Sequence, residues 1–267
     1  MRVYSHTACT FHDPGPGHAE RPLRLVAVTE ALRENFPGLD WQEAPRASRG
    51  QLLRVHDDAL LAPVLDTAVD GPMALDPDTV LAPGSAEAAL RAAGAGIAAV
   101  DAVMHGEVRR AFCAVRPPGH HATAVVAMGF CLFNNIAVAA AHACDKHGLS
   151  RVAVVDFDVH HGNGTQAIFD TDPRVMYLSS HQMPLYPDTG YANERGVGNI
   201  VNAPLPPDCG SDGFRRAWRE QLLPALDSFR PQMLFISAGF DGHKRDPLAQ
   251  LELETDDYAW ITRELVA

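Results

Sequence analysis

The segment VVDFDVHHGNGTQAIF, residues 154–169, constrains the fold more than any other part of the sequence. It begins as an apolar run typical of a covered parallel strand, and it ends in two carboxylates and two imidazoles before turning on glycines. The four polar side chains are Asp156, Asp158, His160 and His161. Charge at a buried strand end costs free energy unless it is paired or bound to a metal. The segment therefore predicts a strand that leads into a polar site.

Short β-like segments alternate with longer helical ones along the chain. We expect strands at residues 2–5, 111–115, 151–158, 174–181, 198–205 and 232–240. We expect helices at residues 22–36, 57–69, 84–106, 134–148, 213–229 and 255–266, with Ser85 as an N-cap. This alternation indicates an α/β fold with a mostly parallel central sheet and helices on both faces. Because no repeat or low-complexity linker divides the chain, we expect a single domain over residues 1–267.

Composition narrows the functional class. The formal charge of -11 argues against a nucleic-acid surface, which needs clustered Lys and Arg. The five cysteines are an odd number, widely spaced and without a C-x-x-C pair, which is typical of thiols in a reducing cytoplasm. The N-terminus lacks the apolar run of a signal peptide, and charged residues interrupt the Ala-rich stretch at 86–104. We expect a soluble cytoplasmic protein that binds neither nucleic acid nor membrane, and whether it forms a homo-oligomer stays open.

Three segments place polar groups at the ends of predicted strands, namely RPPGHHA (116–122), DFDVHHG (156–162) and SAGFDGH (237–243). In parallel sheets, ligands bind outside the carboxyl ends of the strands. Asp158 and His160 are two residues apart, so on a strand they would point to the same side. Asp241, from another strand, could complete a three-ligand site. Two carboxylates and one imidazole with an open position form a plausible catalytic site for Zn²⁺ or a similar divalent ion.

These motifs resemble the histone deacetylase superfamily, particularly its bacterial deacetylase-like and acetylpolyamine amidohydrolase branch. Further similar segments, in family order, are HAERPLRL (18–25), VHDDAL (55–60), DPDTVLAPGSAEAALRAAG (76–94), GFCLFNN (129–135) and YLSSHQMPLYPDTG (177–190). The resemblance implies the three-layer arginase/deacetylase-like fold. It also implies a zinc-dependent amidohydrolase that removes acetyl or other acyl groups from lysine side chains or polyamines.

The resemblance implies roles for individual residues. Asp158, His160 and Asp241 match the family's ligands for one catalytic Zn²⁺. His121 matches the general base that activates the metal-bound water and then protonates the leaving amine. His120, held by Asp156, would give electrostatic support, and Asn163 matches the residue that orients the second histidine.

Further roles concern the substrate and a second ion. The resemblance implies a narrow substrate tunnel lined by Gly129, Phe130 and Tyr186, and a rim aspartate at Asp78. A structural K⁺ site would comprise Asp156, the backbone oxygens of Asp158 and His160, and Ser179. A tunnel with aromatic walls suits the methylene stem of an acyl-lysine or acylpolyamine.

Two alternatives stay open. A binuclear-manganese ureohydrolase would need carboxylates where this chain has Gly162 and Gly239. A catalytically impaired member that binds acyl-lysine or polyamine would explain why no G-G-Y motif follows Asp241, where only Tyr258 occurs. We expect the chain as given to lack the family's C-terminal strand and Gly-Gly-Tyr turn. It should therefore bind metal yet hydrolyse acyl substrates poorly, because the tyrosine that stabilises the transition state is absent. The physiological substrate and the acyl length are not determined by the sequence.

Overall fold

This computed structural model describes residues 1–266, which divide into two compact units. The first unit runs from Met1 to Gly148, and the second begins at Leu149. Each unit has its own parallel sheet. That the two units behave as a single domain remains a prediction.

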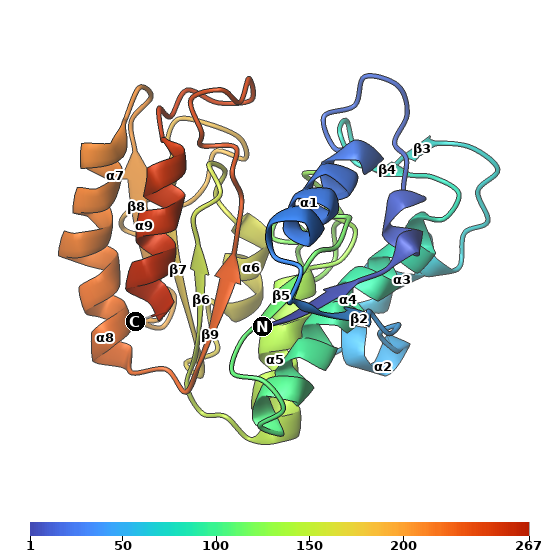
Figure 1. Ribbon diagram of the computed structural model, residues 1–267, viewed down its shortest axis with the longest axis horizontal. Coiled ribbons are helices and arrows are strands. Elements are labelled where there is room, and N and C mark those ends of the chain that lie inside the picture. Colours follow the sequence, from blue (N-terminus) through green and yellow to red (C-terminus); the bar gives the residue numbers. More distant parts are fainter. Residues whose placement is uncertain (267) are drawn as a thin grey trace. The chain divides into compact units, whose positions relative to one another are not determined.

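The first unit is built on a three-stranded parallel sheet with the order β2-β1-β5 (Figure 1). Its strands are β1 (Arg2–Ser5), β2 (Asp40–Glu43), β5 (Ala111–Cys113) and an antiparallel pair, β3 (Met73–Ala74) and β4 (Val80–Leu81). Its helices are the 3-10 helix η1 (Thr7–Thr10), α1 (Pro22–Asn35), α2 (Arg49–Leu52), α3 (Asp58–Leu65), α4 (Ser85–Met104) and α5 (Asn135–His147).

Helices cover both faces of this sheet. Side chains alternate along its strands, so each face offers apolar residues for a helix to pack on. Val3 of β1 packs with Leu25 of α1 on one face, and Tyr4 packs with Ala95 of α4 on the other. Helix α5 packs on α4. A Cβ at Gly96 would lie 2.9 Å from the Cβ of Ala139, so a glycine is needed for the two helices to approach so closely.

The second unit is built on a four-stranded parallel sheet with the order β8-β7-β6-β9 (Figure 1). Its strands are β6 (Val152–Asp156), β7 (Val175–Gln182), β8 (Ile200–Leu205) and β9 (Met233–Ser237). Its helices are α6 (Asn163–Phe169), α7 (Ser211–Ala217), the π-helical segment η2 (Trp218–Leu222), α8 (Leu223–Phe229) and α9 (Thr255–Val266).

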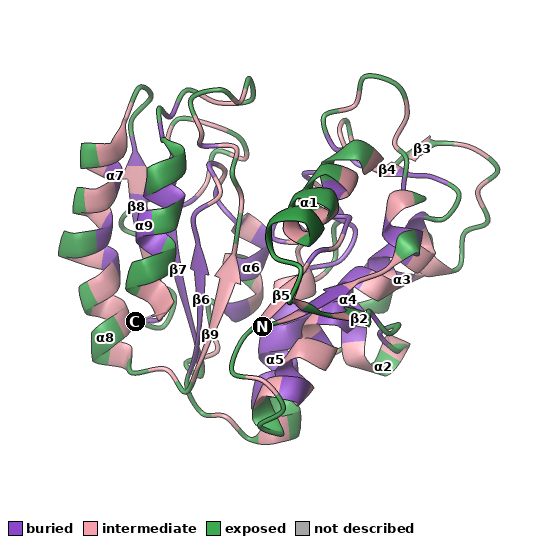
Figure 2. Cartoon of the chain, viewed as in Figure 1, coloured by how far each residue is buried: buried purple, intermediate pink, exposed green. Residues whose placement is uncertain are grey.

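The core of the second unit lies between this sheet and the helices α7 to α9. Val155 of β6 and Leu178 of β7 pack there with Trp218 of η2 and Ile261 of α9. Helix α6 packs against β7. Strands β6 and β7 are buried along their whole length, as the purple ribbon in Figure 2 shows. A strand covered on both faces is apolar at consecutive positions, which is why these segments were recognisable in the sequence.

The α/β class and the parallel arrangement of the strands are confirmed, and each predicted helix is present, with bounds that differ by up to four residues. Some details were wrong. Strand β9 ends at Ser237 and not at 240, helix α3 ends at Leu65 and not at 69, and β2, α2 and α6 were not predicted. Ser85 is not an N-cap: Gly84 caps α4 with φ +88°, and the buried Ser85 hydroxyl accepts a hydrogen bond from the backbone N–H of Ala82 instead. Strand β6 ends at Asp156, two residues before the predicted end, because the backbone N–H of Asp158 turns back to the Asp156 carboxylate.

Candidate active site

The turn after β6 is held by the carboxylate of Asp156, which is completely buried. Its Oδ1 accepts a hydrogen bond from the backbone N–H of Asp158 at 3.1 Å. Its Oδ2 accepts one from the hydroxyl of Tyr177 at 3.2 Å, and that hydroxyl in turn accepts the backbone N–H of Gly162 at 3.0 Å. Tyr177 was not predicted as a site residue. Its position in β7, opposite Val154, places it beside this turn.

Asp158, His160 and Asp241 lie together, and their candidate ligand atoms are all within 4.8 Å of one another. The Nδ1 atom of His160 is 3.1 Å from Oδ1 of Asp158 and 3.0 Å from Oδ2 of Asp241. Asp158 and His160 follow β6, whereas Asp241 follows the neighbouring strand β9. The backbone N–H of Val159 donates to Asp241 Oδ1 at 3.0 Å and ties the two loops together.

Beyond the end of β6, side chains still alternate between buried and partly buried positions. Phe157 and Val159 are buried in the core of the second unit, and they fix the loop by apolar packing. Asp158 and His160 are only partly buried. The loop therefore presents its two candidate ligands on the side away from the core.

Electrostatics in this cluster favour a bound cation. Burial lowers the pKa of His160, but hydrogen bonds and charge from Asp158 and Asp241 outweigh it and raise that pKa to about 10. Burial and the Asp158 carboxylate raise the pKa of Asp241. Two carboxylates close together repel each other, and a positive charge between them relieves this repulsion. The donor set, one imidazole and two carboxylates, fits a divalent ion such as Zn²⁺.

Glycine occupies both positions where a ureohydrolase would need carboxylates. A Cβ at Gly239 would overlap the carboxylate of Asp158, so a larger residue there would displace this side chain. Gly162 lies at the start of α6 and donates its backbone N–H to Tyr177. Neither position has a side chain that could hold a second metal ion.

Other predicted residues of the second unit surround the same turn. Ser179 of β7 is in register with Asp156 of β6, and both are completely buried, as a structural cation site would require. The ring of Tyr186 lies edge-on to that of His160, with 6.3 Å between centroids. Asn163 is the first residue of α6. The structure thus brings these residues together around the end of β6.

The tandem histidines lie in the first unit, in the loop between β5 and α5. Both are buried, and their ring centroids are 4.0 Å apart. Two residues that were not predicted support this loop. Asn134 caps α5 and donates its side-chain amide to Ala122 O at 3.1 Å. His56 contacts Thr123 O through Nδ1 at 2.9 Å and accepts the Asn134 backbone N–H through Nε2 at 2.9 Å.

Predicted tunnel and rim residues of the first unit also lie close to one another. A Cβ at Gly129, where φ is +56°, would overlap the ring of His121. Phe130 donates its backbone N–H to Thr79 Oγ1, and the same hydroxyl donates to Asp78 Oδ1. Burial and the neighbouring Asp76 raise the pKa of Asp78. Gly129, Phe130 and Asp78 therefore form one connected group with His121.

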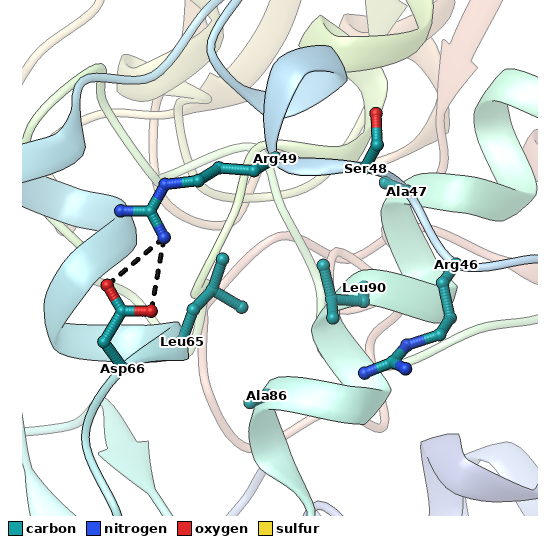
Figure 3. A pocket seen from close by; sticks show the side chains of 8 residues that line it. All are labelled: Arg46, Ala47, Ser48, Arg49, Leu65, Asp66, Ala86 and Leu90. Carbon is teal, nitrogen blue, oxygen red and sulfur yellow. Dashed lines mark hydrogen bonds and ion pairs between the residues drawn. The ribbon is translucent and has the colours of Figure 1, made fainter.

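A surface pocket of the first unit has a different character (Figure 3). It is lined by Arg46, Ala47, Ser48, Arg49, Leu65, Asp66, Ala86 and Leu90. Figure 3 shows the Arg49 guanidinium directed at the Asp66 carboxylate, with both N–O distances at 3.2 Å. Arg46 is paired with Glu87 at 2.8 Å. Because its cations are already neutralised and no predicted site residue lines it, this pocket is not the candidate active site.

Parallel sheets flanked by helices, with a carboxylate–imidazole–carboxylate cluster beyond the strand ends, define an α/β protein of the arginase/deacetylase class. Comparison with known proteins narrows the class. The family model that describes the histone deacetylase domain matches residues 18–267 of this chain. The chain therefore belongs to the histone deacetylase family.

Individual relatives agree with this assignment. A probable deacetylase of Archaeoglobus fulgidus is 40% identical over 99% of this chain and 76% of its own length. A histone deacetylase-like amidohydrolase of Pseudomonas aeruginosa is 42% identical over 92% of this chain and 67% of its own length. The crystal structure of the HDA15 HD domain matches 99% of this chain and 81% of its own, with a TM-score of 0.94 and 35% identity. The three-layer deacetylase fold predicted from the sequence is confirmed.

Proposed function

We propose that the protein hydrolyses the amide bond of an acylated primary amine, either an acyl-lysine side chain or an acylpolyamine. The observation that carries this proposal is the convergence of Asp158, His160 and Asp241 at the ends of β6 and β9. These three residues would hold one Zn²⁺ ion. Such an ion supplies Lewis-acid chemistry, in that it polarises a carbonyl oxygen and lowers the pKa of water.

The chain's own residues perform the proton transfers. His121 takes a proton from the attacking water and gives it to the leaving amine, a role that the family resemblance supports. The buried imidazole pair suits this role, since burial lets a small change in charge alter proton affinity strongly. His120 stabilises the positive charge that develops on its neighbour. Gly129 leaves room for the His121 ring, and Phe130 and Tyr186 bind the methylene stem of the substrate.

A second ion and the location of the protein complete the proposal. Asp156 and Ser179, with backbone oxygens of Asp158 and His160, would hold K⁺ and stiffen the turn that carries the ligands. We propose a location in the reducing cytoplasm, where free thiols such as the five cysteines of this chain are stable. No helix within residues 1–266 is long and apolar enough to cross a membrane.

The test is turnover of an acetyl-lysine peptide and of an acetylated polyamine by the purified chain, with the metal content measured in parallel. Hydrolysis of either substrate that is lost with chelator and restored by Zn²⁺ supports the proposal. A metal-loaded chain that binds both substrates but releases no acetate would instead identify a binding protein.

A further inference from the structure

A second group of metal-ligating side chains lies in the first unit, where the last turns of α4 and α5 pack together. Asp101 comes from α4, and His142 and His147 come from α5. The Nε2 atoms of both histidines lie 2.7 Å from the same carboxylate oxygen, Oδ1 of Asp101. Their candidate ligand atoms are all within 4.8 Å of one another. None of these residues belongs to the proposed active site.

We propose that Asp101, His142 and His147 form a second binding site for a divalent transition metal ion, with Zn²⁺ as the ion their chemistry fits. Imidazole and carboxylate donors suit Zn²⁺, which binds three or four of them tetrahedrally. Tetrahedral Zn–N and Zn–O bonds of about 2.0 Å separate two donor atoms by about 3.3 Å. Each histidine nitrogen must therefore move roughly half an ångström away from the Asp101 oxygen. The Asp101 side chain is 39% exposed, so it has room to shift.

A fourth ligand is close by. His105 lies one turn beyond Asp101 at the end of α4 and is exposed to solvent. Its ring centroid is 5.9 Å from that of His147. A modest rotation of this exposed side chain would complete a set of three imidazoles and one carboxylate.

The charges at this position also favour a cation. Carbonyl groups at the ends of α4 and α5 give both helix termini a partial negative charge, which Asp101 increases.

One contact competes with the metal. Nη1 of Arg54 lies 2.6 Å from Nδ1 of His142 and donates to it, so the imidazole proton resides on Nε2, which faces Asp101. Binding a metal through Nε2 requires that proton to move to Nδ1. The guanidinium of Arg54, which is only partly buried, must then turn away. Removing it should therefore strengthen metal binding.

The experiment uses the full chain carrying Asp158→Ala and His160→Ala, so that the proposed catalytic site cannot bind metal. Equilibrium dialysis against Zn²⁺ should still give one bound ion per chain. Asp101→Asn or His147→Gln in this background should abolish that binding, whereas Glu34→Gln on the exposed face of α1 should leave it unchanged. Arg54→Leu should tighten binding roughly tenfold, equivalent to 1.4 kcal/mol. Circular dichroism would verify that every variant is folded.

Co²⁺ offers an independent readout. Substitution by Co²⁺ should give the intense visible absorption of a tetrahedral site, and the spectrum should change when His105→Gln removes the fourth ligand. The proposal is overturned if the double variant binds no Zn²⁺, in which case the cluster only clamps two helices. It is also overturned if Asp101→Asn leaves the binding unchanged. Neither result bears on the proposed deacetylase activity, because the background already lacks its ligands.

Discussion

The Nδ1 atom of His160 lies 3.0 Å from Oδ2 of Asp241, although 81 positions separate the two residues in the sequence. The contact exists because β6 and β9 are neighbours in the parallel sheet, with Asp156 paired to Ser237 at their ends. Each strand turns away just beyond this pair, and the two loops meet through the hydrogen bond from Val159 to Asp241. The meeting of these candidate ligands is thus a direct consequence of strand order.

Substitution of one ligand should remove both metal and activity. In Asp241→Asn, the amide oxygen is a weaker donor and the charge that balances the ion is lost, so we expect one Zn²⁺ fewer per chain than in the parent and no measurable turnover. Metal content by mass spectrometry and acetate release would be measured together. Asp227→Asn, which changes an exposed carboxylate on α8, is the matched control and should behave like the parent chain. A zinc content in purified Asp241→Asn equal to that of the parent chain would refute the assignment.

The two tandem histidines should differ in their effect on the rate. His121→Ala should lower kcat by about 10²-fold or more, the usual contribution of a general acid–base residue. His120→Ala should lower it less, since that residue only supports its neighbour electrostatically. Turnover at saturating substrate would be compared at equal metal content. Small and equal losses in the two variants would mean that another group transfers the proton.

A methyl group at Gly129 should disturb His121 without touching the metal ligands. In Gly129→Ala, the new Cβ would overlap the imidazole of His121, so we expect turnover to fall about 10²-fold while Zn²⁺ content stays the same. Gly106→Ala provides the control for backbone strain, because φ is +72° there but no atom lies within 4 Å of the Cβ. Both variants should lose about 1–2 kcal/mol of stability from the left-handed backbone. Activity that falls equally in both would show that strain is responsible.

The same substitution at Gly239 should act on the metal instead. The Cβ in Gly239→Ala would overlap the carboxylate of Asp158, and displacing a ligand should weaken Zn²⁺ binding by roughly 10–100-fold, the range seen when ligand-orienting residues are altered. Gly210→Ala is the control, since its Cβ would make an ordinary contact of 3.7 Å with Glu252 O. Competition with a chelator gives both affinities. An unchanged affinity in Gly239→Ala would mean that Asp158 is not a ligand.

His56 should make the protein less stable in mild acid. Burial lowers the pKa of His56 to about 4 in the folded state, whereas the unfolded chain has the usual value of about 6.5. As the pH falls, the unfolded state therefore binds the proton first. The contribution of neutral His56 to the free energy of unfolding is complete above pH 6.5 and is lost as the pH falls towards 4. Between pH 7 and pH 5 this amounts to about 2 kcal/mol.

The comparison uses His56→Gln, whose neutral amide can donate and accept as the imidazole does but does not titrate. Urea denaturation at pH 7 and pH 5 should show that the parent chain loses about 2 kcal/mol more than this variant. Equal losses would mean that His56 is solvated in the folded protein.

The sequence by itself determined the α/β class, the position of the buried strands and the identity of the residues now proposed as ligands. It could do so because these features are local. A fully covered strand such as β6 must be apolar at consecutive positions, and a polar cluster directly after it has few structural explanations. The alternation of Phe157 and Val159 with Asp158 and His160 likewise remained visible, because burial imposes it even where the ladder hydrogen bonds have ended.

Other features were decided only by the tertiary structure, because they depend on contacts between distant segments. No local pattern indicates that Tyr177 binds both Asp156 and Gly162, or that His56 holds the loop of the tandem histidines through Asn134. The pairing of Asp101 with His142 and His147 could not be predicted from the sequence either, because a lone histidine on a helix resembles any surface residue. These side chains meet because strand order and helix packing bring together residues that are far apart in the chain, and that choice is made by burial of the whole core.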